Sequence, residues 1–177
     1  MTTFTERMRD AAFPENIPGN WAGAVGGYFG GPRAFNVWSP GNWRRFSHLR
    51  KLPIWVSGLN GLNEGKAAVV ELRHLGVPQN TFVVADMETR VDKTYCQHFG
   101  NVMDDAGYKM LVYGSASTVF GNPSPHGYWV ADYAGKGPFM YDGPPGADVR
   151  MTQYVAGQNY DSSTVKDYTY NQAEWWI

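Results

Sequence analysis

Apolar residues follow two different periods in the first part of the chain, and segments of the two kinds alternate. Short runs of small or β-branched apolar residues predict strands over residues 22–29, 35–38, 52–57, 81–88 and 109–114. Between them, apolar residues recur at helical spacing behind Ser39-Pro40, over residues 63–75 and after Asp92. Ser39 and Asp92 are predicted helix caps, and Gly76 and Gly107 are predicted to end the second and third helices. Strands that alternate with helices in this way predict an α/β fold with parallel strands.

The last part of the chain has strand patterns without helices. Residues 128–133 and 149–155 have strand patterns, and the segment between them is rich in Gly and Pro with no helical stripe. A full eight-fold α/β barrel typically takes about 250 residues, so a chain of 177 residues is too short for one. Residues 1–20 contain turn formers and little periodicity, so we expect an N-terminal arm followed by a single domain over residues 21–177.

Composition and charge indicate which classes of binding partner to expect. The formal net charge of −1 argues against binding nucleic acid or an anionic membrane by charge. The sequence has no apolar run that could span a bilayer and no secretory signal pattern at its start, so we expect synthesis in the cytoplasm and no membrane partner. Aromatic residues make up 15% of the chain, and since aromatic rings stack on sugars, this excess fits a carbohydrate ligand.

Two acids stand at the end of the strand predicted over residues 81–88. Asp86 and Glu88 are two residues apart, so both side chains should point to the same face of the sheet. In parallel α/β barrels, the carboxyl ends of the strands carry the active site. Two neighbouring carboxylates cannot both ionise freely, so the pKa of one should rise and that group could donate a proton. Cleavage of a glycosidic bond requires such a pair.

Further polar and aromatic residues stand near the ends of later strands. They are Tyr113, Trp129, Asp132, Tyr133, Gln153 and Tyr154, with Asp161 in a following loop. Acids, amides and aromatic rings at the same end of successive strands are typical of a sugar-binding cleft. The acids could instead hold a divalent cation, but no His joins them, so we expect no transition-metal site.

Four motifs in this order, VADME, DDAGYKMLVYGS, YWVADY and TQYVAGQNYD, resemble glycoside hydrolase family 25, the lysozyme-type muramidases. They are still more similar to the divergent glycoside-hydrolase-like relatives of that family in Gram-positive bacteria and their phages. The resemblance covers roughly residues 22–161. It implies a shortened, TIM-barrel-like (β/α) barrel with helices mainly in its first half. It also implies hydrolysis of the β-1,4 bond between N-acetylmuramic acid and N-acetylglucosamine in peptidoglycan.

The resemblance also implies roles for individual residues. Glu88 matches the general acid of the family, and Asp86 matches the carboxylate that stabilises the developing charge or orients the N-acetyl group. Tyr113 and Tyr154 match cleft aromatics, and Asp161 matches a late acid. The nucleophile would be the N-acetyl oxygen or a water, and no cofactor is implied. The partner would be cell-wall glycan, reached outside the cell through phage lysis or as part of a virion.

One stretch departs from the family pattern. The first strand of the family usually carries an acid that lines the cleft, whereas the matching stretch here is GGYFGG, with Tyr28 near that place. We therefore expect Tyr28 to line the cleft, and Asp132 is a candidate to replace the missing acid. The missing acid also favours a second hypothesis: a catalytically silent barrel that binds glycan, or a structural part of a phage particle or cell envelope with assembly partners there.

Overall fold

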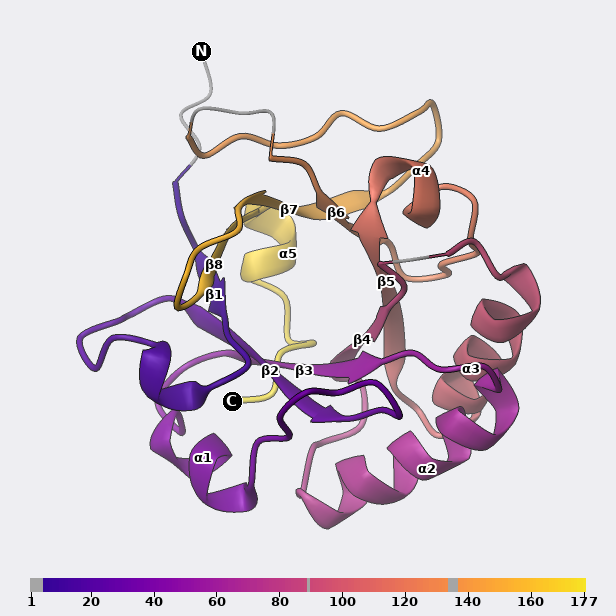
Figure 1. Cartoon of the computed structure of the whole chain (residues 1–177), viewed down its shortest axis with the longest axis horizontal. Helices are drawn as coiled ribbons and strands as arrows, with labels where there is room; N and C mark the ends of the chain where they lie inside the picture. The colour runs from indigo at the N-terminus through magenta and orange to yellow at the C-terminus, as the bar shows by residue number, and fades with distance from the viewer. Residues whose placement is uncertain (1–4, 89, 134–136) are drawn as a thin grey trace.

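The computed structural model describes residues 5–88, 90–133 and 137–177, and its strands close into a barrel (Figure 1). The strands are β1 (Met8–Asp10), β2 (Ala24–Gly30), β3 (Lys51–Val56), β4 (Phe82–Asp86), β5 (Lys109–Ser115), β6 (Tyr128–Ala131), β7 (Val149–Val155) and β8 (Asp161–Val165). Strands β1 to β7 run parallel in sequence order, and β8 closes the barrel by pairing antiparallel with both β7 and β1. This confirms the predicted TIM-barrel-like α/β fold.

The helices lie mainly in the first half of the fold, as expected. They are α1 (Pro40–Arg45), α2 (Gly61–His74), α3 (Lys93–Asp105), the one-turn helices α4 (Ala116–Val119) and α5 (Asp167–Tyr170), and a short 3-10 turn (Pro14–Asn16). Figure 1 shows α1, α2 and α3 along the side of β2 to β5, whereas the one-turn helices α4 and α5 and long loops lie near β6 to β8. The predicted caps are present, because the Ser39 hydroxyl accepts from the Asn42 N–H and the Asp92 carboxylate from the Tyr95 N–H. The barrel therefore has eight strands, but the later strands are connected without long helices.

Three segments differ from the prediction. Met8–Asp10, expected within an N-terminal arm, is a strand whose residues pair with both β2 and β8. Residues 35–38, expected to form a strand, lie in a loop. There Trp38 turns inward and donates its indole N–H to the carbonyl of Ala11, while Phe35 is 82% exposed. Asp161, expected in a loop, is the first residue of β8.

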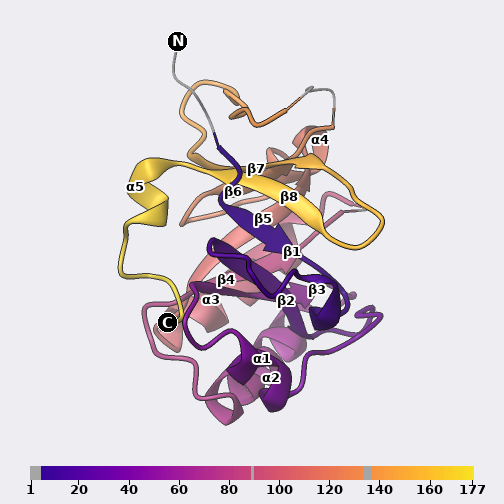
Figure 2. The same ribbon diagram turned by 90° about the vertical axis from the view of Figure 1, so that its left-hand side faces the viewer.

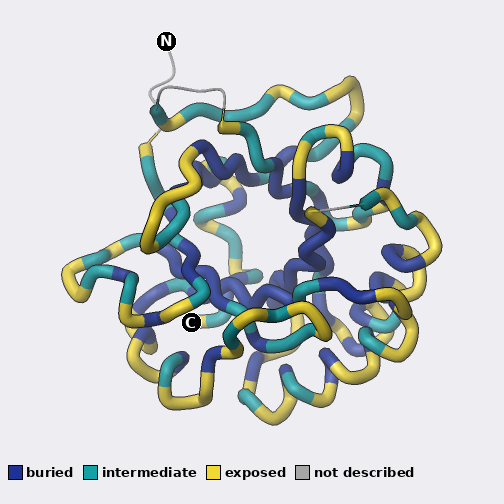
Figure 3. The backbone as a smooth tube through the Cα atoms, viewed as in Figure 1, coloured by how far each residue is buried: buried dark blue, intermediate teal, exposed yellow. Residues whose placement is uncertain are grey.

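Side chains along the strands alternate between the barrel interior and its outer face. One buried cluster fills the interior and includes Met8, Leu52, Phe82, Leu111, Trp129 and Met151. A second lies between the barrel and the helices and includes Val25, Val83, Val112, Leu72 and Phe99. Figure 2 shows the fold from the side. Figure 3 colours the backbone by burial, with buried residues in the strands at the centre and exposed residues on the outer sides of the helices. Within the described ranges, no helix is long and apolar enough to cross a membrane.

Candidate active site

The direction of β8 brings acids from opposite ends of the chain to one mouth of the barrel. Asp10 is the last residue of β1, and Asp86 is the last residue of β4. Parallel strands end at the same edge, but an antiparallel strand begins there, so Asp161 starts β8 directly beside Asp10. Glu88 follows β4 by two residues. The mouth at the carboxyl ends of the strands therefore gathers four acids from three strands.

The acids at this mouth influence one another electrostatically. Burial raises the pKa of Asp10 well above its ordinary value, and the charges of Asp161, Asp86 and Glu88 raise it further. Burial also raises the pKa of Asp161, and the charge of Glu88 raises it further. Hydrogen bonds from the Gly157 N–H and the Gln153 side chain lower this pKa but do not outweigh burial. Because each effect of this kind requires proximity, the four acids form one electrostatic cluster.

Asp86 ends β4, whereas Glu88, which was expected on the same strand, lies in the turn after it, and the two acids occupy different environments. Asp86 is 6% exposed, and burial together with the charge of Glu88 raises its pKa to about 7. Glu88 is exposed, and its backbone N–H donates to Oδ1 of Asp86 at 3.2 Å. The carboxyl group with the raised pKa is therefore the buried member of the pair.

A glycine in the next strand makes room for this turn. Gly114 has φ of +153°, and a Cβ atom there would lie 3.3 Å from the Met87 carbonyl oxygen and 3.5 Å from the Glu88 Cα. The backbone carrying Glu88 can pass close to β5 because this position has no side chain.

Three tyrosine hydroxyls border the acids. Burial raises the pKa of the Tyr28 hydroxyl, and all four acids raise it further, so its ring reaches the same cluster from β2. The Tyr113 hydroxyl lies 3.4 Å from Oε1 of Glu88, to which it donates, and 3.5 Å from the Tyr133 hydroxyl. Tyr133 is 51% exposed at the rim. The tyrosines thus supply hydroxyl groups and ring surface beside the carboxylates.

The floor of the mouth carries buried polar atoms without partners. The Trp129 ring lies 4.5 Å from the Tyr113 ring, and its indole N–H donates to the Ser163 hydroxyl. Oδ1 of Asp10 and Oε1 of Gln153 are buried and accept no hydrogen bond within the described part of the chain. Buried acceptors of this kind lower the stability of the fold unless a donor reaches them.

Not every predicted site residue joins the cluster. Tyr154 lies on β7 at a register shift in the pairing with β8, and after burial its pKa is influenced by Glu6, Arg9 and Tyr160 rather than by the four acids. This position corrects its expected place among the cleft aromatics. Asp132 follows β6, and its backbone N–H donates to the Gln153 carbonyl.

The acid expected to be missing from the first strand is present. The prediction took the GGYFGG stretch as the first strand, but this stretch lies on β2, and the first strand is β1 with Asp10 at its end. Asp10 thus supplies an acid at the end of the first strand, and the role of Asp132 stays a prediction. The alternation of Met8 and Asp10 was the only available signal, and three residues are too few for a recognisable strand pattern.

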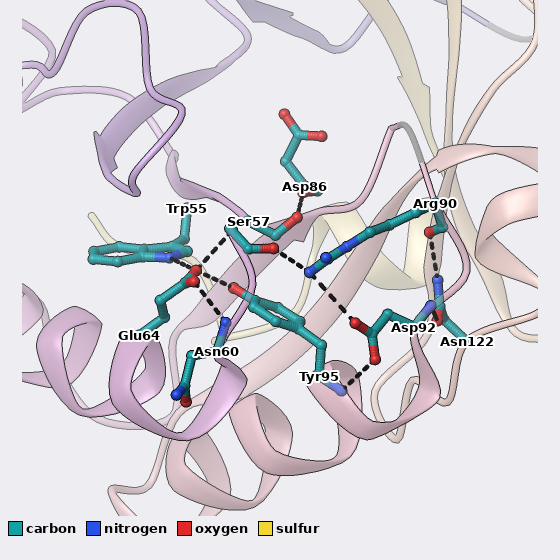
Figure 4. Close-up of polar contacts among 10 residues, drawn as sticks. Trp55, Ser57, Asn60, Glu64, Asp86, Arg90, Asp92, Tyr95 and Asn122 are labelled. Atoms are coloured by element: carbon teal, nitrogen blue, oxygen red, sulfur yellow. Dashed lines mark hydrogen bonds and ion pairs between the residues drawn. The ribbon is translucent and has the colours of Figure 1, made fainter.

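Arg90 points away from the Asp86 carboxylate (Figure 4). Its guanidinium donates to the Gly58 carbonyl and lies 3.6 Å from the Asp92 carboxylate. Behind Asp86, the Ser57 N–H donates to the Asp86 carbonyl at 3.1 Å. These contacts fix the loops after β3 and β4 and leave the carboxylates of Asp86 and Glu88 without a basic partner in the described residues.

The donor set does not have the geometry of a metal site. Over the residues that the structure describes, no group of three or more His, Cys, Asp and Glu side chains could hold a metal ion.

No protein-family model and no curated protein matches this sequence, but solved structures do. An uncharacterised protein of B. stearothermophilus is 17% identical and has a TM-score of 0.72, covering 91% of this chain and 96% of its own. A family 25 glycosyl hydrolase of Bacillus anthracis is 14% identical with a TM-score of 0.69, covering 98% and 93%. The catalytic domain of an endolysin from a Listeria monocytogenes bacteriophage is 16% identical with a TM-score of 0.68, covering 97% of both chains. These likenesses show a fold of the family 25 type.

Proposed function

We propose that this protein is a glycoside hydrolase of the muramidase type, which cleaves the β-1,4 bond between N-acetylmuramic acid and N-acetylglucosamine in peptidoglycan. The observation that carries the proposal is the cluster of Asp10, Asp86, Glu88 and Asp161 at the carboxyl-end mouth of the barrel. A fold shared with a family 25 glycosyl hydrolase and an endolysin catalytic domain supports it. The protein would then act outside the producing cell, at the cell wall.

In this proposal Glu88 donates the proton to the leaving oxygen. Its carboxyl group is exposed to the mouth, next to the Tyr113 hydroxyl, and so can reach a bound glycan. Asp86 has a pKa of about 7 and is therefore largely protonated in mildly acidic solution. Above this pKa Asp86 is ionised, and its carboxylate can then accept a hydrogen bond from the N–H of the N-acetyl group and orient the acetyl oxygen for attack on the anomeric carbon.

The remaining residues of the mouth would bind the sugar. The exposed Glu88 carboxylate and the Tyr113 hydroxyl beside it can exchange hydrogen bonds with the hydroxyl and amide groups of an N-acetylated sugar. Tyr28 and Tyr133 offer ring surface and hydroxyls at the rim, and Asp161 adds a further acceptor. Trp129 would act through Tyr113, whose ring it contacts.

The rival hypothesis is a catalytically silent barrel that binds glycan or belongs to a phage particle or cell envelope. Its main support was a missing first-strand acid, and the presence of Asp10 at the end of β1 removes that support. Glycan binding without cleavage remains one outcome of the experiment below.

The proposal is tested by incubating purified peptidoglycan with the protein and measuring new reducing ends. We expect release by the wild type and a loss of about 10²- to 10⁴-fold in Glu88→Gln. Glu71→Gln on the outer helix α2 is the matched control and should retain the wild-type rate. Binding to cell walls without release of reducing ends by the wild type would overturn the hydrolase and leave the binding barrel.

A further inference from the structure

A second cavity lies at the opposite end of the barrel from the acids. It is about 330 Å³ in volume and includes Trp43, Arg44, Ser47, Lys51, Leu75 and Trp176 in its lining. Lys51 is the first residue of the parallel strand β3, which places this cavity at the amino-terminal ends of the strands. A volume of this size is at the lower end of the range for small-molecule sites.

Lys51 is the unusual residue of this cavity. It is 3% exposed, and its ammonium group lies 4.9 Å from the centroid of the Trp176 ring. No carboxylate pairs with it among the described residues. A buried cation without an anionic partner is costly, because the ring alone does not replace the water that burial removes. Burial accordingly lowers the pKa of Lys51.

The surroundings of Lys51 favour an anion. Arg44 contributes a second positive charge, and the part of the lining that the structure describes contains no Asp or Glu side chain. The Trp43 and Trp176 rings, with centroids 5.1 Å apart, form an aromatic wall. The cavity thus combines the positive charges of Lys51 and Arg44 with flat apolar surface.

We propose that this cavity binds a small organic anion, a carboxylate with a flat apolar body. Its carboxylate would pair with Lys51 and Arg44, and its body would lie against Trp43 and Trp176. Charge neutralisation and removal of aromatic surface from water would then stabilise the same ligand. The site is separate from the acidic mouth, whose negative charge would repel such a ligand.

The proposal is tested by isothermal titration of the purified protein with benzoate, and with benzamide as its neutral counterpart. We expect saturable binding of benzoate to one site per chain, with an affinity that falls as ionic strength rises. Benzamide should bind more than about tenfold more weakly, because it cannot neutralise Lys51. Lys51→Met should weaken benzoate binding more than about tenfold, and Lys66→Met, an exposed lysine of α2, should leave it unchanged.

Thermal unfolding checks that Lys51→Met is folded, and Arg44→Gln supplies an independent variant because Arg44 is exposed. Arg44→Gln should weaken benzoate binding about threefold or more. No saturable heat with benzoate, equal affinity for benzamide, or unchanged affinity in folded Lys51→Met would each overturn the proposal.

Discussion

Asp10 and Asp161 are neighbours across the seam of the barrel, where the last residue of β1 pairs with the first residue of β8. Their proximity depends on the antiparallel direction of β8, because a parallel eighth strand would carry its first residue to the other end of the barrel. The same reversal lets a chain with few late helices close its barrel. Strand β8 thus closes the barrel and also contributes Asp161, one of the four acids.

The raised pKa of Asp86 predicts a stability that depends on pH. Its pKa is about 7 in the folded protein and 3.8 ordinarily, so between these values the folded chain keeps a proton that the unfolded chain releases. Stability from this group is therefore lost as pH rises through this window. Asp86→Asn removes the effect. We expect its stability relative to wild type to increase by about 3 kcal/mol between about pH 5 and about pH 8.

Urea unfolding of both proteins at several pH values measures this difference. Asp105→Asn, at an exposed position at the end of α3, is the control and should follow the wild type. A difference between Asp86→Asn and wild type that stays constant with pH would contradict the raised pKa.

The Tyr113 hydroxyl should matter for turnover but little for folding. Tyr113→Phe removes the donor to Glu88 and keeps the ring that lies 4.5 Å from Trp129. We expect peptidoglycan cleavage to fall about tenfold with little change in Tm. Tyr154→Phe on β7 should cleave at the wild-type rate. If Tyr154→Phe lost more activity than Tyr113→Phe, the assigned mouth would be wrong.

Gly26 should be required for the position of Asp10. A Cβ atom at Gly26 would lie 2.7 Å from Cβ of Asp10 and 3.2 Å from Cδ1 of Ile54, both inside the barrel. Gly26→Ala should therefore lower the free energy of unfolding by about 1–3 kcal/mol and reduce cleavage. Gly19→Ala is the control, because a Cβ there meets nothing within 4 Å. Equal stability of the two variants in urea would contradict the close packing around Asp10.

Glu64 should stabilise the loop that precedes α2. Its carboxylate accepts from the N–H groups of Gly58 and Asn60, the Trp55 indole and the Tyr95 hydroxyl (Figure 4). Glu64→Gln has one acceptor oxygen in place of two, so we expect a loss of about 1–3 kcal/mol at neutral pH.

The loss in Glu64→Gln should itself depend on pH. Burial acts to raise the pKa of Glu64, but its hydrogen bonds outweigh burial and lower the pKa below 4.5. The contribution of the carboxylate is thus present above pH 4.5 and lost as pH falls through the folded-state pKa, so the wild type and Glu64→Gln should converge in acid. Urea unfolding at neutral and acid pH measures this difference in the free energy of unfolding, with Glu71→Gln as the control. A difference between wild type and Glu64→Gln that widened in acid would contradict the lowered pKa.

Periodicity predicted the middle of the fold better than its two ends. Strand β4 and helix α3 have long, clear apolar patterns, and Asp92 and Gly107 mark the limits of α3 as predicted. β1 is three residues long, which is too short for a period to show. β8 has the sequence DSSTV, whose buried hydroxyl residues have no apolar alternation. β1 pairs with β8 at the other end of the sequence, and β8 pairs with the neighbouring β7 as well as with β1, so local patterns contain only part of this pairing.

The same limit applies to the site. The sequence could single out Asp86 and Glu88 as candidate site residues, because both stand in one short segment at the end of a clear strand pattern. It could not single out Asp10, because the place of this residue beside Asp161 depends on closure of the barrel. The position of Tyr154 could not be predicted either, because it lies at a register shift between β7 and β8 that the sequence pattern does not show.

The most direct test of the account is mass spectrometry of the fragments that the protein releases from purified peptidoglycan. We predict fragments with N-acetylmuramic acid at the new reducing end from the wild type, and a loss of about 10²- to 10⁴-fold in Glu88→Gln. Fragments that end in N-acetylglucosamine, or equal release by wild type and Glu88→Gln, would contradict the assignment of a muramidase with Glu88 as its acid.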